Sequence, residues 1–475
     1  MSQGFKFRAY PTPQQAHALV QWIGCQRVIY NAKVQEDRYF RSFARKSLTH
    51  TGQFAPQDQQ YAHFISDETA WLREVPSVIL RNGAVRWKQA YARFFKKLGG
   101  RPKLQKKTGA QSVWITSELF SFEPQTDKAT GEIRYRLLIG TKKFPIGEVE
   151  FKAHRAFEVP ASIIISVDAG RWHVSFSNEM APLPSKRDIA DGLATLSEAD
   201  LTEKAVGLDR GIVIPFCGSN GANFDLSVIQ KSRIAKRQAA AMRWQRKLSR
   251  RVKGGSNRRK AIRRIATLRD YEHRVRHDFA HQTSHSIVAD PEIALIVFEA
   301  LGVQRMTKKA APKQDENGRW IRNGKAAKAG LNKAILGSAW SKTKTCCDYK
   351  AQRAGKLVIE VPAHHTSQEC SRCGHIHPGN RPTQADFVCQ ACGFMANADS
   401  NASTNIRNRG VRLIVSGGYR EKAKKQTMRM REKNKLGVDR SEVTLGEIAV
   451  SREDGIPVFA HGSSNQETPT TTRCV

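Results

Sequence analysis

The 475-residue sequence predicts a β-rich first half that contains helices, followed by an α/β domain that carries a zinc ribbon. Three observations lead to this class. Short alternating strands cluster between residues 112 and 177, with the composition of a small β-barrel. After residue 205, apolar strands alternate with helices, as in α/β domains. Near the end, four cysteines follow the spacing C-x2-C-x15-C-x2-C.

The charge balance is the strongest property of the composition. The chain has 79 Lys and Arg against 43 Asp and Glu, for a formal net charge of +36. Such self-repulsion argues against an enzyme of small metabolites and favours a polyanionic partner. No apolar run reaches the roughly 20 residues that span a bilayer. The N-terminus lacks the apolar core of a signal peptide, and the cysteines outside the ribbon are scattered. We therefore expect a cytoplasmic protein with reduced thiols and no membrane contact.

In the first half, residues 5–10 alternate apolar and basic side chains and predict a strand. A helix follows from Pro11-Thr12-Pro13, and a second helix is expected over 77–97. The second helix places Trp87, Tyr91, Phe94 and Phe95 at helical spacing, which favours core packing over base stacking. Strands are expected at 135–139, 149–151, 163–167 and 172–176, and a polar linker at 182–203.

The second half begins with an expected central strand at 205–214. Residues 231–276 are basic and helical, with a hinge at Gly254-Gly255-Ser256. A buried strand at 293–299 ends on Glu299. A charged and mobile loop is expected at 306–328, then one helix over 333–353 and a strand over 356–361.

The cysteines predict a structural metal site. Cys370, Cys373, Cys389 and Cys392 form two C-x2-C pairs, and the loop between them is long enough to bring all four thiolates around one zinc ion. The nearby histidines are interpreted as solvated or facing nucleic acid, because four sulfurs already complete the site. They are His364, His365, His375 and His377.

Three carboxylates occupy chemically suggestive places. Asp209 lies within the expected central strand, Glu299 ends the buried strand, and Asp399 opens a helix directly after the ribbon. Hard cations such as Mg²⁺ prefer oxygen ligands, and two such ions can activate water and stabilise the leaving oxygen of a phosphodiester. The spacing admits two interpretations: the acids hold catalytic metal, or Asp209 and Glu299 pair with some of the many arginines.

At these residues the sequence resembles a known family. Gly207-Leu208-Asp209-Arg210-Gly211, Ile296-Val297-Phe298-Glu299 and Asn397-Ala398-Asp399 resemble the three motifs of a RuvC-type nuclease domain. Among such domains, these motifs resemble those of the TnpB (OrfB) proteins of insertion sequences and of their descendants, the type V CRISPR effectors. The ribbon and the segment around Tyr10-Pro11-Thr12 also match this family. Ala300 and Ser403 depart from its usual residues, although neither belongs to the acid triplet.

The resemblance implies a domain order. Residues 1–10 and 101–200 would form an oligonucleotide-binding β-barrel, the wedge, interrupted by a helical recognition insertion at 11–100. An RNase H-like (RuvC) domain would occupy 201–365, with basic helices at 229–285, the zinc ribbon at 366–394 and the last helix with the third acid at 395–410. We expect residues 411–475 to form a poorly ordered tail.

The resemblance also implies an activity: RNA-guided cleavage of DNA beside a short motif that the protein reads. Asp209, Glu299 and Asp399 would hold magnesium or manganese, zinc would be structural, and the partners would be a guide RNA and double-stranded DNA with one strand displaced. The expected location is the nucleoid of a prokaryotic cytoplasm.

The basic helices are the expected nucleic-acid contact. They are acid-poor, so intrahelical pairing does not relieve their repulsion, although a solvated charged face is the common alternative. The candidate residues are Lys231, Arg233, Lys236, Arg237, Arg243, Arg246, Lys247, Arg250, Arg251, Arg258, Arg259 and Lys260.

Other functions compatible with this architecture are a nuclease-independent RNA-guided regulator and a compact type V CRISPR effector. The regulator is disfavoured because all three acids are present. A strand transposase acting alone is disfavoured because the His-hydrophobe-His triplet His375-Ile376-His377 lies inside the zinc ribbon, which contains no tyrosine nucleophile.

Overall fold

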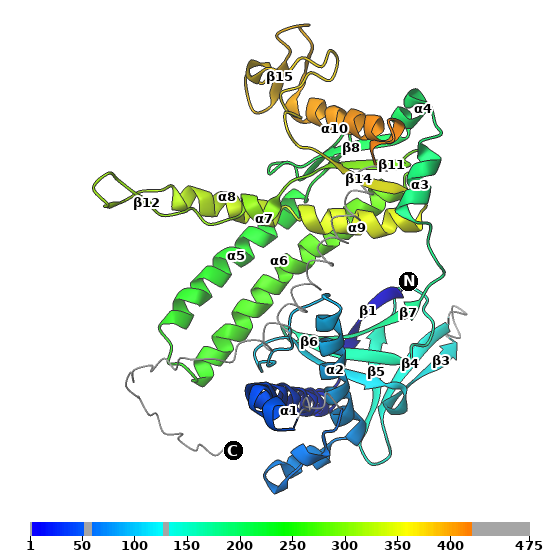
Figure 1. Cartoon of the computed structure of the whole chain (residues 1–475), viewed down its shortest axis with the longest axis vertical. Helices are drawn as coiled ribbons and strands as arrows, with labels where there is room; N and C mark the ends of the chain where they lie inside the picture. The colour runs from blue at the N-terminus through cyan, green and yellow to red at the C-terminus, as the bar shows by residue number, and fades with distance from the viewer. Residues whose placement is uncertain (1, 52–58, 127–132, 420–475) are drawn as a thin grey trace.

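The computed structural model describes residues 2–51, 59–126 and 133–419. Figure 1 shows two sheet-based units, with a long pair of helices running from one toward the other. Each unit has its own hydrophobic core. Among the described residues, no helix combines the length and apolarity that a membrane span requires.

The first unit is built on a seven-stranded antiparallel sheet in the order β2-β6-β7-β1-β5-β4-β3. Its strands are β1 (Ser2–Tyr10), β2 (Gln111–Thr116), β3 (Phe120–Thr126), β4 (Ile133–Gly140), β5 (Pro145–Lys152), β6 (Ser162–Asp168) and β7 (Arg171–Glu179). Aromatic rings fill the core, with Phe5 stacked on Phe176 at 5.4 Å between ring centroids. The expected barrel is not closed by hydrogen bonds within the described ranges, because β2 and β3 remain at opposite edges.

Helices occupy the chain between β1 and β2. They are α1 (Pro13–Thr51), the 3₁₀ segments η1 (Ala62–Phe64) and η2 (Asp67–Glu74), and α2 (Ser77–Phe95). On α2, Trp87 and Tyr91 are 2% and 3% exposed and pack with Tyr30 and Val34 of α1, which confirms the core interpretation for these two rings. It is wrong for Phe95, which is 61% exposed.

The segment expected to be a polar linker is helical. It forms α3 (Lys186–Leu193) and α4 (Glu198–Glu203), capped by the hydroxyls of Ser185 and Ser197. Ala190, Leu193 and Leu201 are buried against strands of the second sheet. The expected linker is therefore wrong: its few apolar residues lie on two short helices that help to cover one face of that sheet.

The second unit contains a five-stranded sheet in the order β10-β9-β8-β11-β14. The strands are β8 (Ala205–Asp209), β9 (Phe216–Gly218), β10 (Asn223–Phe224), β11 (Leu295–Glu299) and β14 (Leu357–Val361). β8, β11 and β14 are parallel, whereas β9 runs antiparallel to β8. This arrangement is the one expected of an RNase H-like domain. The predicted strand 205–214 ends earlier, at Asp209, and residues 210–215 form a loop.

Helices cover both faces of this sheet. α3, α4 and α10 (Ala398–Val415) cover one face, while α6 (Ser256–Ala289), α8 (Lys325–Gly337) and α9 (Trp340–Arg353) cover the other. The single helix expected over 333–353 is therefore two, separated at Ala339, whose φ is 59°. α10 continues to Val415, beyond the end expected at residue 410, and residues 420–475 of the expected tail lie outside the described residues.

Two structures project from the second unit (Figure 1). α5 (Val228–Ser249) and α6 form an antiparallel pair that reaches toward the first unit, where Arg171 Nε lies 3.4 Å from Asp270 Oδ2. The segment expected to be a mobile loop, residues 306–328, starts at the last residue of α7 (Val303–Met306). It contains a short hairpin of β12 (Lys313–Gln314) and β13 (Trp320–Ile321) and the first turn of α8.

Candidate active site

The four cysteine sulfurs of the ribbon lie together. Sγ of Cys370 is 3.7 Å from Sγ of Cys392, and Sγ of Cys373 is 3.6 Å from Sγ of Cys389. All four ligand atoms lie within 4.8 Å of one another. Tetrahedral zinc with Zn–S bonds of about 2.3 Å requires sulfurs about 3.8 Å apart. The four cysteines therefore fit a zinc ion, as their spacing predicts.

Backbone geometry prepares this site in the same way on both knuckles. The amides of Cys370 and Cys389 each donate to the carbonyl five residues further on, at 2.9 Å. Gly374 and Gly393 donate back to those cysteines and adopt φ angles of +76° and +67°. Hydrogen bonding by the Cys392 amide lowers the pKa of the Cys389 thiol to about 7, which favours the thiolate that binds metal.

The neighbouring histidines are not part of the four-sulfur cluster. Among the described residues, the only compact group of metal-ligating side chains is formed by the four cysteines. His377 Nδ1 instead accepts a hydrogen bond from Gly379, and the rings of His364 and His365 contact each other at 3.7 Å.

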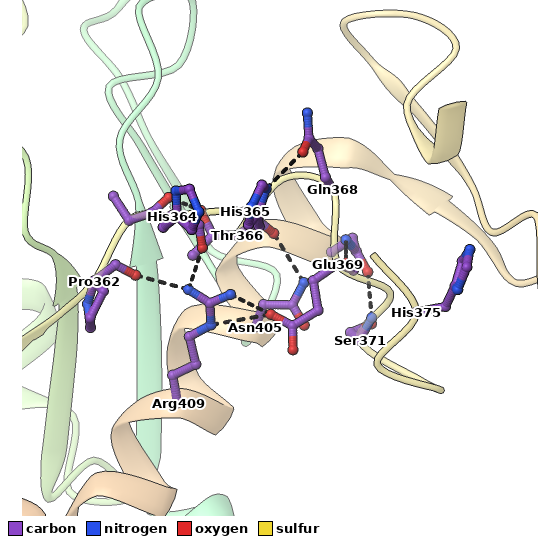
Figure 2. Close-up of polar contacts among 12 residues, drawn as sticks. Pro362, His364, His365, Thr366, Gln368, Glu369, Ser371, His375, Asn405 and Arg409 are labelled. Carbon is purple, nitrogen blue, oxygen red and sulfur yellow. Dashed lines mark hydrogen bonds and ion pairs between the residues drawn. The ribbon is translucent and has the colours of Figure 1, made fainter. Parts of the chain in front are cut away.

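Side chains of α10 hold the segment that enters the ribbon (Figure 2). Asn401 donates to the carbonyl of Glu369 at 2.8 Å, and Asn405 donates to the carbonyls of Thr366 and Glu369 at 3.0 and 2.6 Å. Arg409 donates to the carbonyls of Pro362 and His364 and forms an ion pair with Glu369. Both asparagines are almost fully buried. The ribbon is therefore fixed to the helix whose first turn carries Asp399.

Asp399 is oriented by its own helix end and by the ribbon. Asn397 caps α10, accepting hydrogen bonds from the amides of Asp399 and Ser400 at 3.0 and 3.3 Å. Arg381 of the ribbon places its guanidinium 3.7 Å from Asp399 Oδ1. Burial and the charge of Asp209 raise the pKa of Asp399, while Arg381 acts to lower it.

Asp209 and Glu299 end adjacent parallel strands. β8 and β11 are paired through Leu208 and Phe298, so the two acids emerge side by side at the carboxyl end of the sheet. Glu299 is only 6% exposed. Burial, followed by the hydrogen bond and the charge of Asp209, raises the pKa of Glu299 to about 9, although Arg210 acts to lower it. Ligands at such strand ends are typical of open α/β sheets.

Arg210 is buried beside Asp209 and Glu299 but forms no ion pair with either carboxylate. Its guanidinium donates to the backbone carbonyl of Glu299 and lies over the ring of Phe298. Within the described ranges, no Lys or Arg nitrogen comes within 4.0 Å of a carboxylate oxygen of Asp209 or Glu299. The arginine-pairing interpretation is therefore not realised for these two acids. Placing the buried Glu299 next to a second carboxylate is costly even with the charge of Arg210 nearby, and a bound divalent ion would relieve that cost.

Asp209 thus interacts electrostatically with both Glu299 and Asp399, although the oxygens of the three acids do not close into a cluster as compact as the four sulfurs. Sequence reasoning overlooked the residues that position them: Arg210, Arg381, Asn401, Asn405 and Arg409. The available signal was the spacing of Asn401, Asn405 and Arg409 at four-residue intervals, which places three polar side chains on one helical face.

The predicted nucleic-acid-binding residues lie on the α5–α6 pair. Ten of the twelve candidates are exposed, and the other two, Arg251 and Arg258, are partly buried. Arg258 donates to the carbonyls of Leu248 and Arg251 at 2.7 and 3.1 Å, so it also closes the turn between the helices. Arg237 lies 4.0 Å over the ring of Tyr271, and Lys231 pairs with Asp225.

Comparisons with known families cover much of the chain. Residues 187–310 match the OrfB family of IS605 elements, described as "Probable transposase", and residues 340–406 match the Cas12f1-like TNB domain. Residues 1–38 match an OrfB segment described as a helix-turn-helix domain. Here that segment forms β1 and the beginning of one continuous helix, α1.

Solved structures with a similar course include the cryo-EM structure of the Cas12f1-sgRNA-target DNA complex, with 12% identity and a TM-score of 0.48. That match covers 86% of this chain and 98% of the other. The mini-RNA-guided endonuclease CRISPR-Cas_phi3 gives 11% identity and a TM-score of 0.41, over 86% and 92% of the two chains.

Sequence relatives extend over nearly the whole chain. A protein of Escherichia coli (strain K12) named "Putative RNA-guided DNA endonuclease InsQ" is 28% identical over 87% of this chain and 94% of its own length. A protein of Streptomyces pristinaespiralis with the same activity in its name is 28% identical over 88% and 91%. Together with the three matched segments, these relatives make the chain similar to the OrfB proteins of IS605 insertion sequences over nearly its whole length.

Proposed function

We propose that this protein is an RNA-guided, metal-dependent DNA endonuclease of a mobile element. The observation that supports the proposal is that Asp209 lies beside Glu299 at the carboxyl end of the second sheet and also interacts electrostatically with Asp399. The names of the relatives from E. coli and S. pristinaespiralis support the same activity. We further infer that it acts on DNA of the nucleoid in a prokaryotic cytoplasm.

The three carboxylates would hold magnesium or manganese, because an all-oxygen donor set suits a hard divalent cation. When bound, such ions supply a water of lowered pKa and stabilise the leaving oxygen of the phosphodiester. The protein's own residues supply position. Arg210 fixes the end of β11 through the Glu299 carbonyl, and Arg381 restrains Asp399 from the ribbon side.

The ribbon would hold zinc as a structural ion. The segment that enters its first knuckle is tied to α10 through Asn401 and Asn405, so zinc binding would stabilise the helix that presents Asp399. The wedge role of the first unit and the recognition role of α1 and α2 belong to this proposal as well.

The guide RNA would lie on the exposed basic face of α5 and α6. A phosphate backbone neutralises the dense positive charge there better than the few acids of these helices. Base pairing between RNA and target would supply sequence specificity, while protein contacts hold the duplex and the displaced strand.

The test uses full-length protein purified with its RNA from cells that carry the element. Sequencing the copurified RNA identifies the guide, and a supercoiled plasmid with the matching target then reports cleavage in Mg²⁺. Guided cleavage by the wild type, absent in Asp399→Asn, supports the proposal. Guided binding without cleavage in either protein would instead support an RNA-guided DNA-binding regulator.

A further inference from the structure

The loop that follows Asp209 exposes two apolar side chains on a rigid backbone. Ile212 is 45% exposed and Val213 is 71% exposed. A flexible loop could turn such side chains inward. The backbone of this loop is instead held by tertiary contacts of its first two residues, Arg210 and Gly211. Arg210 is bound to the Glu299 carbonyl, and the Gly211 carbonyl accepts a hydrogen bond from the indole of Trp340 at 3.2 Å.

The turn itself is also tightly constrained. A Cβ added to Gly211 would lie 2.5 Å from the carbonyl oxygen of Ile214, so only glycine fits without a backbone shift. Ile212 and Val213 are thus held in place outside the core. Covering this exposed apolar pair with a ligand would remove apolar surface from water and so be favourable.

A pocket of about 350 Å³ begins at this pair. Its apolar wall contains Ile212, Val213, Pro215 and Leu226, and the opposite side is a stripe of small residues on α8, including Ala334 and Gly337. The volume falls within the range of sites for a single small ligand. Because three residues span at most about 11 Å, the pocket begins within that distance of Asp209 along the backbone.

The remaining wall is basic and ordered. Lys333 of α8 donates to Gln238 of α5 at 3.1 Å, and Gln238 donates to Glu272 of α6 at 2.8 Å. Glu272 pairs with Arg276, whose guanidinium also lies against Gly337. Lys231 completes the cationic lining, with Asp225 as the acidic member. Lys231 and Arg276 are each paired with an acid, whereas Lys333 is held by the uncharged Gln238. A pocket with an apolar wall and a basic lining of this kind is complementary to a nucleotide, with its flat base and its phosphate.

We propose that this pocket binds one nucleotide of the DNA strand that is cut, immediately next to the scissile phosphate. Ile212 and Val213 contact the base, while Lys333 and Arg276 face the sugar–phosphate backbone. The pocket positions the strand over the three acids but takes no part in the chemistry. The proposal rests on the proposed function and assigns its substrate contact.

The test fills the pocket without touching the acids. Ala334→Trp places an indole within it, and Ala329→Trp is the matched control, because Ala329 is exposed on the same helix but does not line the pocket. We expect Ala334→Trp to slow guided cleavage roughly 10- to 100-fold, because the strand is displaced from its position over the acids, while guided binding of target changes less than about twofold. The control should cut at the wild-type rate.

A milder pair of substitutions guards against misfolding. Ile212→Ala with Val213→Ala removes exposed groups only, so the free energy of unfolding should be unchanged while cleavage slows. As a readout independent of activity, target DNA carrying 4-thiothymidine at single positions is photocrosslinked to the Asp209→Asn complex. The adduct next to the cut position should map to the pocket lining.

The outcomes distinguish failure of the nucleotide subsite from failure of the proposed nuclease function. Wild-type rates in both Ala334→Trp and the double alanine variant, or adducts that map away from the pocket, overturn the nucleotide subsite while leaving the nuclease intact. If the wild type carrying its RNA does not cut matched DNA, the proposed function itself fails.

Discussion

The backbone carbonyl of Ser403 lies 2.1 Å from the position that a Cβ on Gly207 would occupy. This contact brings α10 against β8, two residues before Asp209. A second glycine, Gly410, meets the side chain of Val297 on β11, where an added Cβ would lie 2.3 Å away. The helix of the third acid is therefore pressed onto the two strands of the other acids at positions where no side chain fits.

Gly207→Ala should destabilise the protein and reduce cleavage more than stability alone explains. The added methyl group must displace the α10 backbone and with it Asp399. Overpacking of this kind costs about 1–3 kcal/mol or more. Thermal unfolding and guided cleavage at a temperature where the variant remains folded measure the two effects. Gly192→Ala, on α3 with nothing within 4 Å of the added carbon, should leave both unchanged.

Each acid should be required for cleavage but not for RNA or target binding. Asp399→Asn keeps the shape and removes the charge, and combining it with Asp209→Ala should cost little more than either change alone, because each already empties a shared metal site. Mg²⁺ or Mn²⁺ should raise the unfolding temperature of the wild type and raise that of Asp209→Ala less. If Asp399→Asn cuts guided DNA at nearly the wild-type rate, Asp399 is not a ligand of the catalytic metal.

The ribbon and Asp399 should be separable by two substitutions. Cys389→Ser removes a sulfur ligand, so we expect loss of zinc, lower folding yield and loss of cleavage. Asn405→Asp keeps all four sulfurs but replaces the donating amide with a carboxylate that repels the carbonyl oxygens of Thr366 and Glu369. It should retain one zinc by elemental analysis, lose about 1–3 kcal/mol of stability and cut more slowly. Active wild-type protein without zinc would contradict this account.

Two arginines of the basic helices should respond differently to neutralisation. Arg246 is exposed, so Arg246→Gln should weaken RNA binding and reduce the slope of log affinity against log salt by roughly 0.7. Arg258 closes the turn between α5 and α6, so Arg258→Gln should mainly lower stability. Titrations at several salt concentrations distinguish the two. Affinity that does not change with salt would refute a backbone contact.

Acid should destabilise the contact between α6 and α9. His281 lies against Cys346 and Tyr349, and burial, followed by the charge of His277, lowers the pKa of His281 to about 4. The unfolded chain binds a proton near pH 6.5 that the folded chain resists until about pH 4. Stability is therefore full above pH 6.5 and falls as pH drops to about 4. Urea unfolding of His281→Gln should show a weaker decline across this window.

The acids and the ribbon could be predicted because each lies in a short contiguous motif whose chemistry is visible in residue type and spacing. The supports of Asp399 could not, because the bonds from Asn405 to Thr366 and Glu369 join residues more than 35 positions apart. The strand through Asp209 was predicted too long because Ile212 and Val213 continue its apolar pattern. Tertiary contacts of Arg210 and Gly211, rather than propensity, end it.

The packing of α10 onto β8 and β11 has a consequence for synthesis of the protein. The basic helices are complete once residue 289 has been made, whereas Asp399 and the helix that seats it come more than 100 residues later. We expect a nascent or prematurely terminated chain to be able to engage RNA while lacking any means to cut DNA. The order of the segments along the gene thus delays the hazardous activity until translation is nearly finished.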